Sequence, residues 1–215
     1  MGVPHVKICG VTNLEDARRA VDLGAWAIGL IFHPGSPRRC RASDAAAIAA
    51  ALRRRVEIAG VFVNAPLDEV AHKADDLGLS FLQLHGEEGP AYCAEAARRT
   101  GCRVIKAARV RNRGDVDALE PFHTDFHLVD GHAPGLPGGT GETFDWSLLR
   151  ARRTDIPLIL SGGLRAENVG EAIATVRPFA VDVASGVEAE PGRKDPDKLE
   201  AFFAAVSGSA PAGVA

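Results

Sequence analysis

The most constraining feature of this sequence is a regular alternation of short apolar runs and helical patterns. Eight apolar runs, each the length of a β-strand, start at intervals of 22 or 23 residues, with two longer intervals of 33 and 32 residues. A helical pattern follows each run, and the patterns at 13–24 and 67–78 end in glycine, as helices commonly do. The runs begin near Val3, Ala25, Ile58, Ser80, Arg103, Asp125, Pro157 and Phe179. This alternation indicates parallel strands joined by right-handed crossovers.

Eight strand–helix units predict an α/β fold, a single (β/α)8 TIM barrel. We expect this domain to span residues 1–206 and the segment 207–215, "SGSAPAGVA", to be a disordered tail because its residues are small. A doubly wound open sheet shows the same alternation of strands and helices. The rhythm alone therefore leaves that architecture as the alternative.

The composition excludes several classes of partner. The chain has 215 residues, of which 46% are hydrophobic, and a formal net charge of −3, which suits one soluble globular domain. This near-neutral balance gives no indication of a nucleic-acid or membrane surface, and no apolar run approaches the ~18 residues of a membrane span. The four cysteines show neither a C-x-x-C pair nor metal-ligand spacing, so we expect reduced thiols in a cytoplasmic protein.

The two long intervals point to a working face. They contain the segments 33–43, "HPGSPRRCRAS", and 131–144, "GHAPGLPGGTGETF", which are rich in proline and glycine. Each segment follows the carboxyl end of a predicted strand. In a barrel such loops gather on one face, and active sites lie on that face.

Four polar side chains are predicted at this face. Cys9 ends the first run, and a T-x-x-E capping-box pattern at 12–15 predicts a helix start directly after it. Arg38 lies in the loop after the second run, His85 ends the fourth, and Asp130 ends the sixth. A substrate between Cys9 and Asp130 could meet a base on one side and an acid on the other. The alternatives are an inert buried thiol, a solvated arginine, a histidine bonded to its own loop and a turn-forming aspartate.

The loops after the last two runs predict a phosphate site. Residues 161–164 read "SGGL" and residues 181–188 read "VDVASGVE". Glycine lets the backbone N–H groups approach an oxyanion closely, and barrels often bind phosphate at these two positions. Gly162, Gly163, Ser185 and Gly186 fit this role, although glycines also serve simple tight turns.

One charged pair is predicted inside the barrel. Lys7 lies two residues before Cys9 on the same strand, so its side chain also points inward, where an unpaired ammonium would cost several kcal/mol. Asp182, between Val181 and Val183, points inward from the strand that closes the barrel beside the first. We therefore predict an ion pair between Lys7 and Asp182, which places positive charge near Cys9. The alternative is that Lys7 reaches solvent and Asp182 caps the phosphate loop.

Together these residues resemble a known family, the phosphoribosylanthranilate isomerases of tryptophan biosynthesis. The matching segments extend from the first predicted strand to the last helix, and the combination of the first, fifth and seventh is specific to the family. They are "KICGVT" (7–12), "GLIFHPGSPR" (29–38), "GVFVN" (60–64), "LQLHG" (82–86), "GGTGETFDW" (138–146), "LSGGL" (160–164), "RPFAVDVASGVE" (177–188) and "PGRKD" (191–195).

The resemblance implies an Amadori rearrangement that converts N-(5-phosphoribosyl)anthranilate into 1-(2-carboxyphenylamino)-1-deoxyribulose 5-phosphate. It implies that Cys9 is the general base, Asp130 the general acid, and Arg38 the ligand of the anthranilate carboxylate. The phosphate would rest on the two glycine-containing loops, and we count His85 and Asp182 among the substrate-binding residues. Because the positive nitrogen of the substrate activates it, no metal or organic cofactor is expected. We expect a monomer or homodimer acting on this small molecule.

The chemistry sets two expectations for proton affinity. The acid must stay protonated, so burial should raise the pKa of Asp130, and nearby positive charge should lower the pKa of Cys9. Three departures from the family pattern concern substrate affinity rather than the reaction. His33 stands where tyrosine is usual, Ala184 where serine is common, and Glu142 where lysine is frequent.

Three other functions are alternatives for a chain of this kind. A related isomerase of histidine biosynthesis carries aspartate at the end of its first strand, where this chain has Cys9. A Schiff-base enzyme would need a strand lysine, and only Lys7 and Lys106 among five lysines lie on predicted strands. A non-catalytic module that binds phosphorylated metabolites would be expected to lose the acid or the base, and this sequence keeps both.

Overall fold

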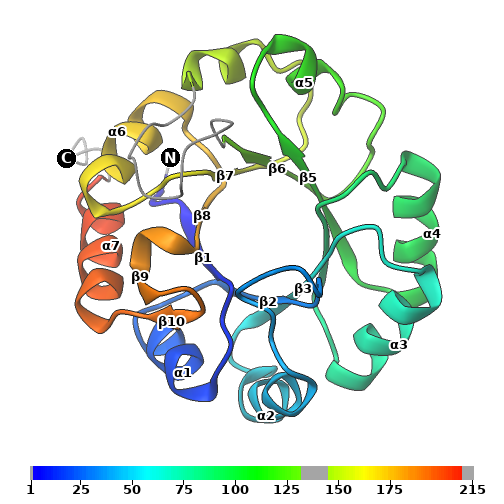
Figure 1. Cartoon of the computed structure of the whole chain (residues 1–215). Helices are drawn as coiled ribbons and strands as arrows, with labels where there is room; N and C mark the ends of the chain where they lie inside the picture. Colours follow the sequence, from blue (N-terminus) through cyan, green and yellow to red (C-terminus); the bar gives the residue numbers. More distant parts are fainter. Residues whose placement is uncertain (1, 132–144, 210–215) are drawn as a thin grey trace.

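A computed structural model describes residues 2–131 and 145–209 and shows a closed barrel of eight parallel strands (Figure 1). The strands pair in sequence order, and β1 pairs with β8, which confirms the predicted barrel and excludes the open sheet. Each strand starts within two residues of its predicted position. The bounds are β1 (His5–Cys9), β2 (Ala27–Ile31), β3 (Glu57–Phe62), β4 (Phe81–Leu84), β5 (Arg103–Arg109), β6 (Phe126–Asp130), β7 (Leu158–Ser161) and β8 (Ala180–Val183).

Helices surround this ring of strands (Figure 1). Within the described residues, the segment between β6 and β7 carries a 3-10 helix, η1 (Trp146–Ala151), where an α-helix was expected. A second 3-10 helix, η2 (Ser185–Val187), follows β8. The α-helices are α1 (Leu14–Asp22), α2 (Ala42–Leu52), α3 (Leu67–Leu77), α4 (Pro90–Thr100), α5 (Arg113–Asp117), α6 (Ala166–Val176) and α7 (Pro196–Gly208). None of the described helices is both long enough and apolar enough to cross a membrane.

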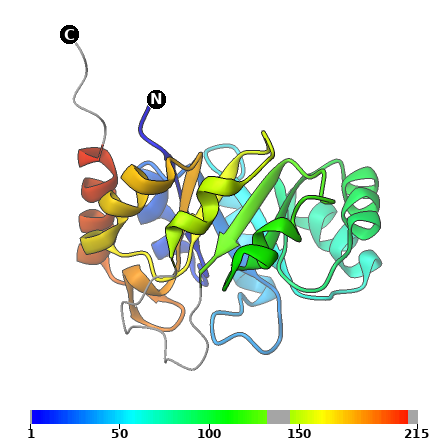
Figure 2. The same ribbon diagram turned by 90° about the horizontal axis from the view of Figure 1, so that it is seen from above.

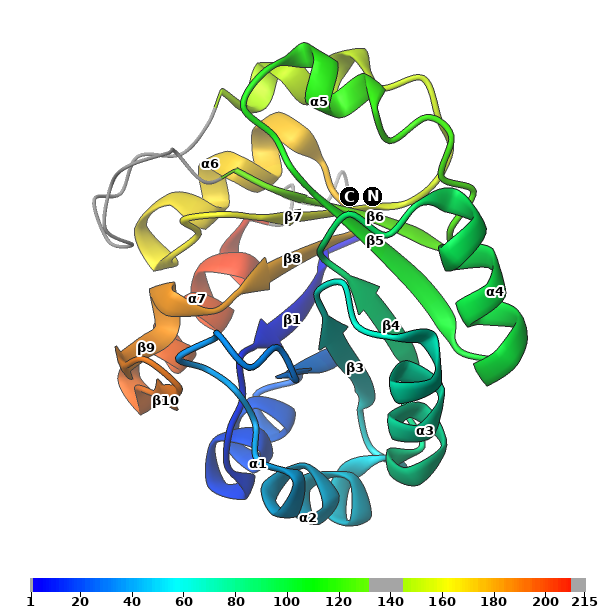
Figure 3. The same cartoon turned by 45° about the vertical axis from the view of Figure 1, so that its right-hand side comes forward.

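A short antiparallel hairpin, β9 (Glu188–Glu190) with β10 (Arg193–Lys194), separates η2 from α7. The sequence rhythm did not predict it, because its strands have three and two residues and no apolar alternation. Figure 3 shows this hairpin beside the loop that follows β2, far from it in sequence. The hairpin thus connects the last strand of the barrel to the beginning of the chain.

Two local expectations need correction. The capping box expected at 12–15 does not form, because Asn13 caps the first helix and its side chain accepts from the N–H of Asp16 at 2.9 Å. The hydroxyl of Thr12 instead donates to the Gly192 carbonyl in the hairpin. The expected tail begins too early, because α7 continues through residue 208. Buried Val206 anchors its last turn, and the N–H of Ser209 donates to the Val206 carbonyl at 3.2 Å. Residues 210–215 lie outside the described part.

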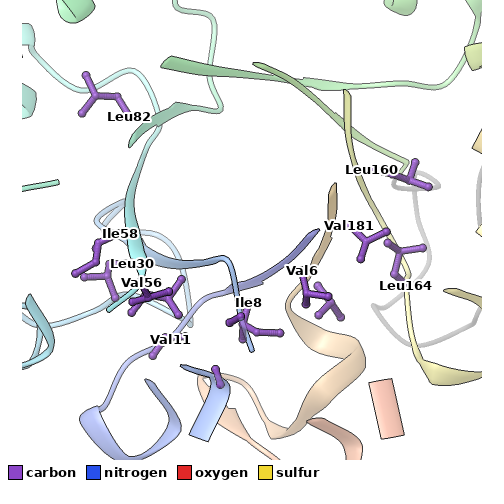
Figure 4. Close-up of a cluster of buried hydrophobic side chains, with 14 of the residues drawn as sticks. Val6, Ile8, Val11, Leu30, Val56, Ile58, Leu82, Leu160, Leu164 and Val181 are labelled. Atoms are coloured by element: carbon purple, nitrogen blue, oxygen red, sulfur yellow. The ribbon is translucent and has the colours of Figure 1, made fainter. Parts of the chain in front are cut away.

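The core has two layers that differ in character. Apolar side chains on the outer side of the strands, among them Ile8, Leu30 and Val181, fill the space below the helices (Figure 4). Inside the barrel, an aromatic cluster packs at the amino ends of the strands, with ring centroids 5.2–5.8 Å apart. Its members are Trp26, Phe81, Phe126 and Phe179. The other inward positions carry both apolar residues, such as Ile105, Leu128 and Ile159, and the polar groups that are described next.

Candidate active site

The carboxyl ends of the strands gather the predicted residues at one face. In Figure 2 the loop after β2 and the β9–β10 hairpin extend from this face, while the segment leading into β1 lies at the other. Cys9 is the last residue of β1, Asp130 is the last of β6, and His85 directly follows β4. Because all eight strands run in parallel, these side chains share one end of the barrel.

Cys9 is buried against β2, with 6% of its surface exposed. Its register partner is Gly29, and a Cβ on that glycine would lie 2.8 Å from the Cys9 Sγ and 3.1 Å from the Lys7 Nζ. The thiol and the ammonium therefore occupy the space that a side chain at position 29 would need. This close approach places both groups at the same point inside the barrel.

The predicted pair of Lys7 and Asp182 is confirmed. The two residues are register partners across the β1–β8 seam, and the Lys7 Nζ lies 2.7 Å from the Asp182 Oδ1. The hydroxyl of Ser161 donates to the other carboxylate oxygen at 3.3 Å. Burial would lower the pKa of Lys7, but the charges of Asp182 and Cys9 outweigh it, so that this pKa is raised. Asp182, expected to bind substrate, is thus engaged by two protein side chains.

The proton affinity of Cys9 differs from expectation. Burial raises the pKa of the thiol, Lys7 and Lys194 act against this rise, and the charge of Asp182 adds to it. The expected positive charges are present, but desolvation outweighs them because the thiol lies entirely inside the barrel. In this structure the neutral thiol is therefore the favoured form.

Arg38 is held by an acidic residue that the sequence analysis missed. The Arg38 Nε lies 2.9 and 3.0 Å from the two carboxylate oxygens of Glu188, and its Nη2 lies 2.8 Å from Oε2. The arginine is thus a fixed group at the mouth rather than a freely solvated charge. Glu188 is the first residue of β9 and is 6% exposed. The available signal was an acid and a lysine flanking a Pro-Gly turn, "EAEPGRK" at 188–194.

Lys194 is the second missed residue of this group. Its Nζ donates to the Cys9 carbonyl at 2.7 Å, to the Ala184 carbonyl at 3.1 Å and to the Glu188 carboxylate at 3.0 Å. Its side chain has no exposed surface. One ammonium therefore joins the end of β1, the end of β8 and the hairpin.

His85 lies beside Asp130. The His85 Nε2 is 3.6 Å from the Asp130 Oδ2, and the side chains are 20% and 24% exposed. The other ring nitrogen lies 3.4 Å from the Gln83 amide nitrogen. At 3.6 Å the imidazole and the carboxyl group are in close electrostatic contact but not in a short hydrogen bond. The histidine is thus turned toward the barrel mouth rather than bonded only within its own loop.

A buried pair supports the turn that carries His85. The Lys106 Nζ lies 3.1 Å from the Glu88 carboxylate and 2.7 Å from the Gly86 carbonyl, and Glu88 also accepts from the N–H groups of Asn64 and Gly86. A cavity of about 500 Å³ lies alongside. Lys7 and Lys106, the two lysines on the barrel strands, are therefore both ion-paired. Schiff-base chemistry needs a neutral amine, so this pairing weighs against it.

The two glycine-containing loops touch each other. Gly162 and Gly163, directly after β7, have φ angles of +95° and +65°. A Cβ on Gly186 would overlap the Leu164 carbonyl oxygen, so the loop after β8 packs directly on the loop after β7. Ser185, the remaining residue predicted to bind phosphate, begins η2 beside this contact. The loops predicted to hold a phosphate thus form one continuous backbone surface.

Two of the three departures noted in the sequence lie within the described residues. The ring of His33 lies against Gly35, where a Cβ would be 2.9 Å from its Nε2. Ala184 contributes its carbonyl to Lys194. Glu142, with the segment 132–144, lies outside the described residues. No cluster of three or more His, Cys, Asp or Glu side chains in the described ranges could hold a metal ion.

The fold and the site define an enzyme-type (β/α)8 barrel with titratable groups at the carboxyl ends of its strands. Residues 6–205 match the family model of N-(5′-phosphoribosyl)anthranilate (PRA) isomerase. The chain belongs to this isomerase family. An N-(5′-phosphoribosyl)anthranilate isomerase from Citrifermentans bemidjiense is 48% identical over 199 residues, which cover 93% of this chain and 95% of the relative.

Solved structures agree with this assignment. Phosphoribosyl anthranilate isomerase from Thermotoga maritima is 45% identical, with a TM-score of 0.87 over 95% of this chain and 99% of that one. A phosphoribosyl anthranilate isomerase in complex with reduced 1-(o-carboxyphenylamino)-1-deoxyribulose 5-phosphate is 42% identical, with a TM-score of 0.82 and the same coverage.

Proposed function

We propose that this chain converts N-(5-phosphoribosyl)anthranilate into 1-(2-carboxyphenylamino)-1-deoxyribulose 5-phosphate by an Amadori rearrangement in tryptophan biosynthesis. The observation that carries the proposal is the convergence of Cys9, Asp130, Arg38 and the paired glycine loops on one barrel mouth, in a member of this family. The relative in complex with a reduced form of this product supports the choice of substrate.

Asp130 is proposed to start the reaction as the general acid. Its protonated carboxyl group gives a proton to the furanose ring oxygen, and the ring opens to an iminium ion. The positive nitrogen makes the hydrogen on C2′ acidic. The Cys9 thiolate removes that proton, and the resulting enolamine tautomerises to the ketone. Each such group contributes on the order of 10²–10⁴-fold to the rate.

The raised pKa of Cys9 makes the charges around it important. A thiolate at this buried position needs compensation, and Lys7 and Lys194 both act in that direction. The iminium nitrogen adds a third positive charge in the step that uses the base. The thiolate is thus favoured most when the opened substrate is bound, which suits a base that acts after ring opening.

The remaining residues are proposed to bind the two anionic ends of the substrate. Arg38, oriented by Glu188, would bind the anthranilate carboxylate with its remaining N–H groups. The backbone of the loops at Gly162, Gly163, Ser185 and Gly186 would bind the phosphate. His85 and Asp182 are proposed to contact the opened sugar or to position the groups that do.

The experiment supplies phosphoribosylanthranilate, generated in situ, and follows the loss of its fluorescence. Cys9→Ala and Asp130→Asn should each abolish turnover while the fold persists, because the first lacks a base and the second cannot deliver a proton. Cys40→Ala, Cys93→Ala and Cys102→Ala serve as matched controls and should keep activity. The kcat/KM of the wild type should show a bell-shaped pH profile. Retention of more than a few per cent of wild-type kcat would remove the tested residue from its role.

We further propose a cytoplasmic enzyme that acts as a monomer or homodimer. One solved structure from Thermotoga maritima contains monomers generated from a dimeric phosphoribosylanthranilate isomerase, and it is 41% identical to this chain with a TM-score of 0.83 over 95% of this chain and 99% of that one. Size-exclusion chromatography with light scattering would decide between the two states.

A further inference from the structure

The Lys194 ammonium has a hydrogen-bond acceptor for each of its three protons. Three acceptors surround the Nζ within 3.1 Å: the Cys9 carbonyl, the Ala184 carbonyl and the Glu188 carboxylate. A neutral amine has only two N–H groups, so this set of partners fits the charged form. Burial lowers the pKa of Lys194, and the charge of Glu188 acts against that change. Glu188 is therefore the residue that keeps this buried lysine charged.

The charged groups around Cys9 come from three elements. Lys7 faces it from β1, Asp182 from β8 and Lys194 from β10. Lys7 and Asp182 form a 2.7 Å pair and cancel in formal charge. Lys194, Glu188 and Arg38 form the second group, with formal charges of +1, −1 and +1 that leave a surplus of +1. Lys7 is the strongest of the charges that favour the thiolate, Asp182 opposes it, and Lys194 adds a second positive charge from the hairpin.

We propose that Lys194 is a positioning residue for Cys9: it fixes the carboxyl end of β1 and adds, beside Lys7, a second positive charge that stabilises the thiolate. The inference rests on the proposed role of Cys9 as base. Glu188 acts through Lys194, because it offsets the burial of the ammonium. The hairpin then belongs to the acid–base machinery, although neither of these side chains needs to touch the substrate.

The test measures the alkylation of Cys9 by iodoacetamide as a function of pH, in the intact chain, with peptide mass spectrometry to resolve the four cysteines. Lys194→Met should slow Cys9 alkylation near pH 7 about tenfold and move the profile to higher pH, because loss of one neighbouring cation disfavours the thiolate. A change in the access of iodoacetamide to Cys9 would alter the limiting alkylation rate at high pH. A change in the charge around the thiol would instead move the profile along the pH axis. The limb of the kcat/KM profile that reports Cys9 should move in the same direction.

Two further variants keep the proposal testable if Lys194→Met folds poorly. Lys194→Gln keeps an N–H donor for the carbonyls but removes the charge, so the Cys9 profile should again move to higher pH. Arg193→Met is the matched control, because Arg193 is exposed on the same strand, and it should leave the profile unchanged. An unchanged Cys9 profile in folded Lys194→Met and Lys194→Gln proteins would overturn the proposal. Alkylation does not require turnover, so this outcome is distinct from failure of the isomerase assay with the wild type.

Discussion

Lys7 shows how a single charged side chain is accommodated inside the barrel. Its side chain has no exposed surface, and that of Asp182 is 5% exposed. Removal of one partner of such a pair leaves the other charge buried and uncompensated, which is costly. The pair is therefore a condition for the fold as well as a neighbour of the thiol.

Lys7→Met should lower the free energy of unfolding by about 3–5 kcal/mol, because it leaves Asp182 without a counter-ion. Urea denaturation followed by circular dichroism measures the change. The control is Arg98→Met, which removes a cation from an exposed pair with Glu95 and should cost far less, because solvent screens the pair. Similar losses in both variants would contradict the view that Lys7 is the counter-ion of a buried carboxylate. Adding Asp182→Asn to Lys7→Met should recover part of the stability.

The residues at the site divide into those that the sequence could predict and those that it could not. Lys7 and Asp182 were predictable, because side-chain alternation and barrel closure place both on the same inner level. The contribution of Glu188 and Lys194 depends on a hairpin folding back onto β1, a contact between residues 185 positions apart. The pKa of Cys9 was predicted in the wrong direction, because sequence shows the neighbouring charges but not the degree of burial.

At the scale of elements, the loops after β7 and β8 act as one unit. Gly186 packs on the Leu164 carbonyl with no space for a side chain. The phosphate surface proposed here depends on this contact, because it sets the distance between the backbone N–H groups of the two loops.

Gly186→Ala should therefore separate the loops and reduce kcat/KM, mainly through a higher KM, by roughly 10- to 100-fold, the cost of misplacing a binding group by about 1 Å. Gly170→Ala is the matched control. A Cβ at that position in α6 would meet nothing within 4 Å, so activity should persist with stability unchanged or slightly increased. Steady-state kinetics with the fluorescent substrate gives both constants. An unchanged KM in the Gly186→Ala protein would argue against phosphate binding at this contact.

The elements themselves were predictable to different degrees. The apolar rhythm located all eight strands, because each is buried on its outer face by helices and carries consecutive apolar residues. The end of α7 was missed, because small residues at 207–209 give little signal while buried Val206 fixes the turn. The β9–β10 hairpin was missed because its short strands are stabilised by charged side chains rather than by an apolar face.

For the whole molecule, the buried thiols predict sensitivity to alkaline pH. Burial, assisted by the charge of Asp44, raises the pKa of Cys40 to about 12. A thiol whose folded pKa lies above its unfolded value of 9.0 contributes stability below about pH 9, and this contribution is lost as pH rises toward 12.

The stability advantage of the wild type over Cys40→Ala should therefore shrink between about pH 8.5 and about pH 11. Urea titrations under reducing conditions at several pH values measure it, and the sign of the change is independent of the packing cost of the alanine. Arg98→Met, which alters only an exposed pair, should track the wild type across this range. A difference that stays constant or grows with pH would show that the Cys40 thiol is not responsible.

The aromatic cluster at the amino ends of the strands gives the barrel a floor. Trp26, Phe81, Phe126 and Phe179 pack within 5.8 Å of their neighbours, below the level of the Lys7 pair. In the part of the chain that the structure describes, buried side chains fill the barrel at this end and close it to a substrate. Substrate and product must therefore use the same face, at the carboxyl ends of the strands, so the departure of product precedes the arrival of the next substrate.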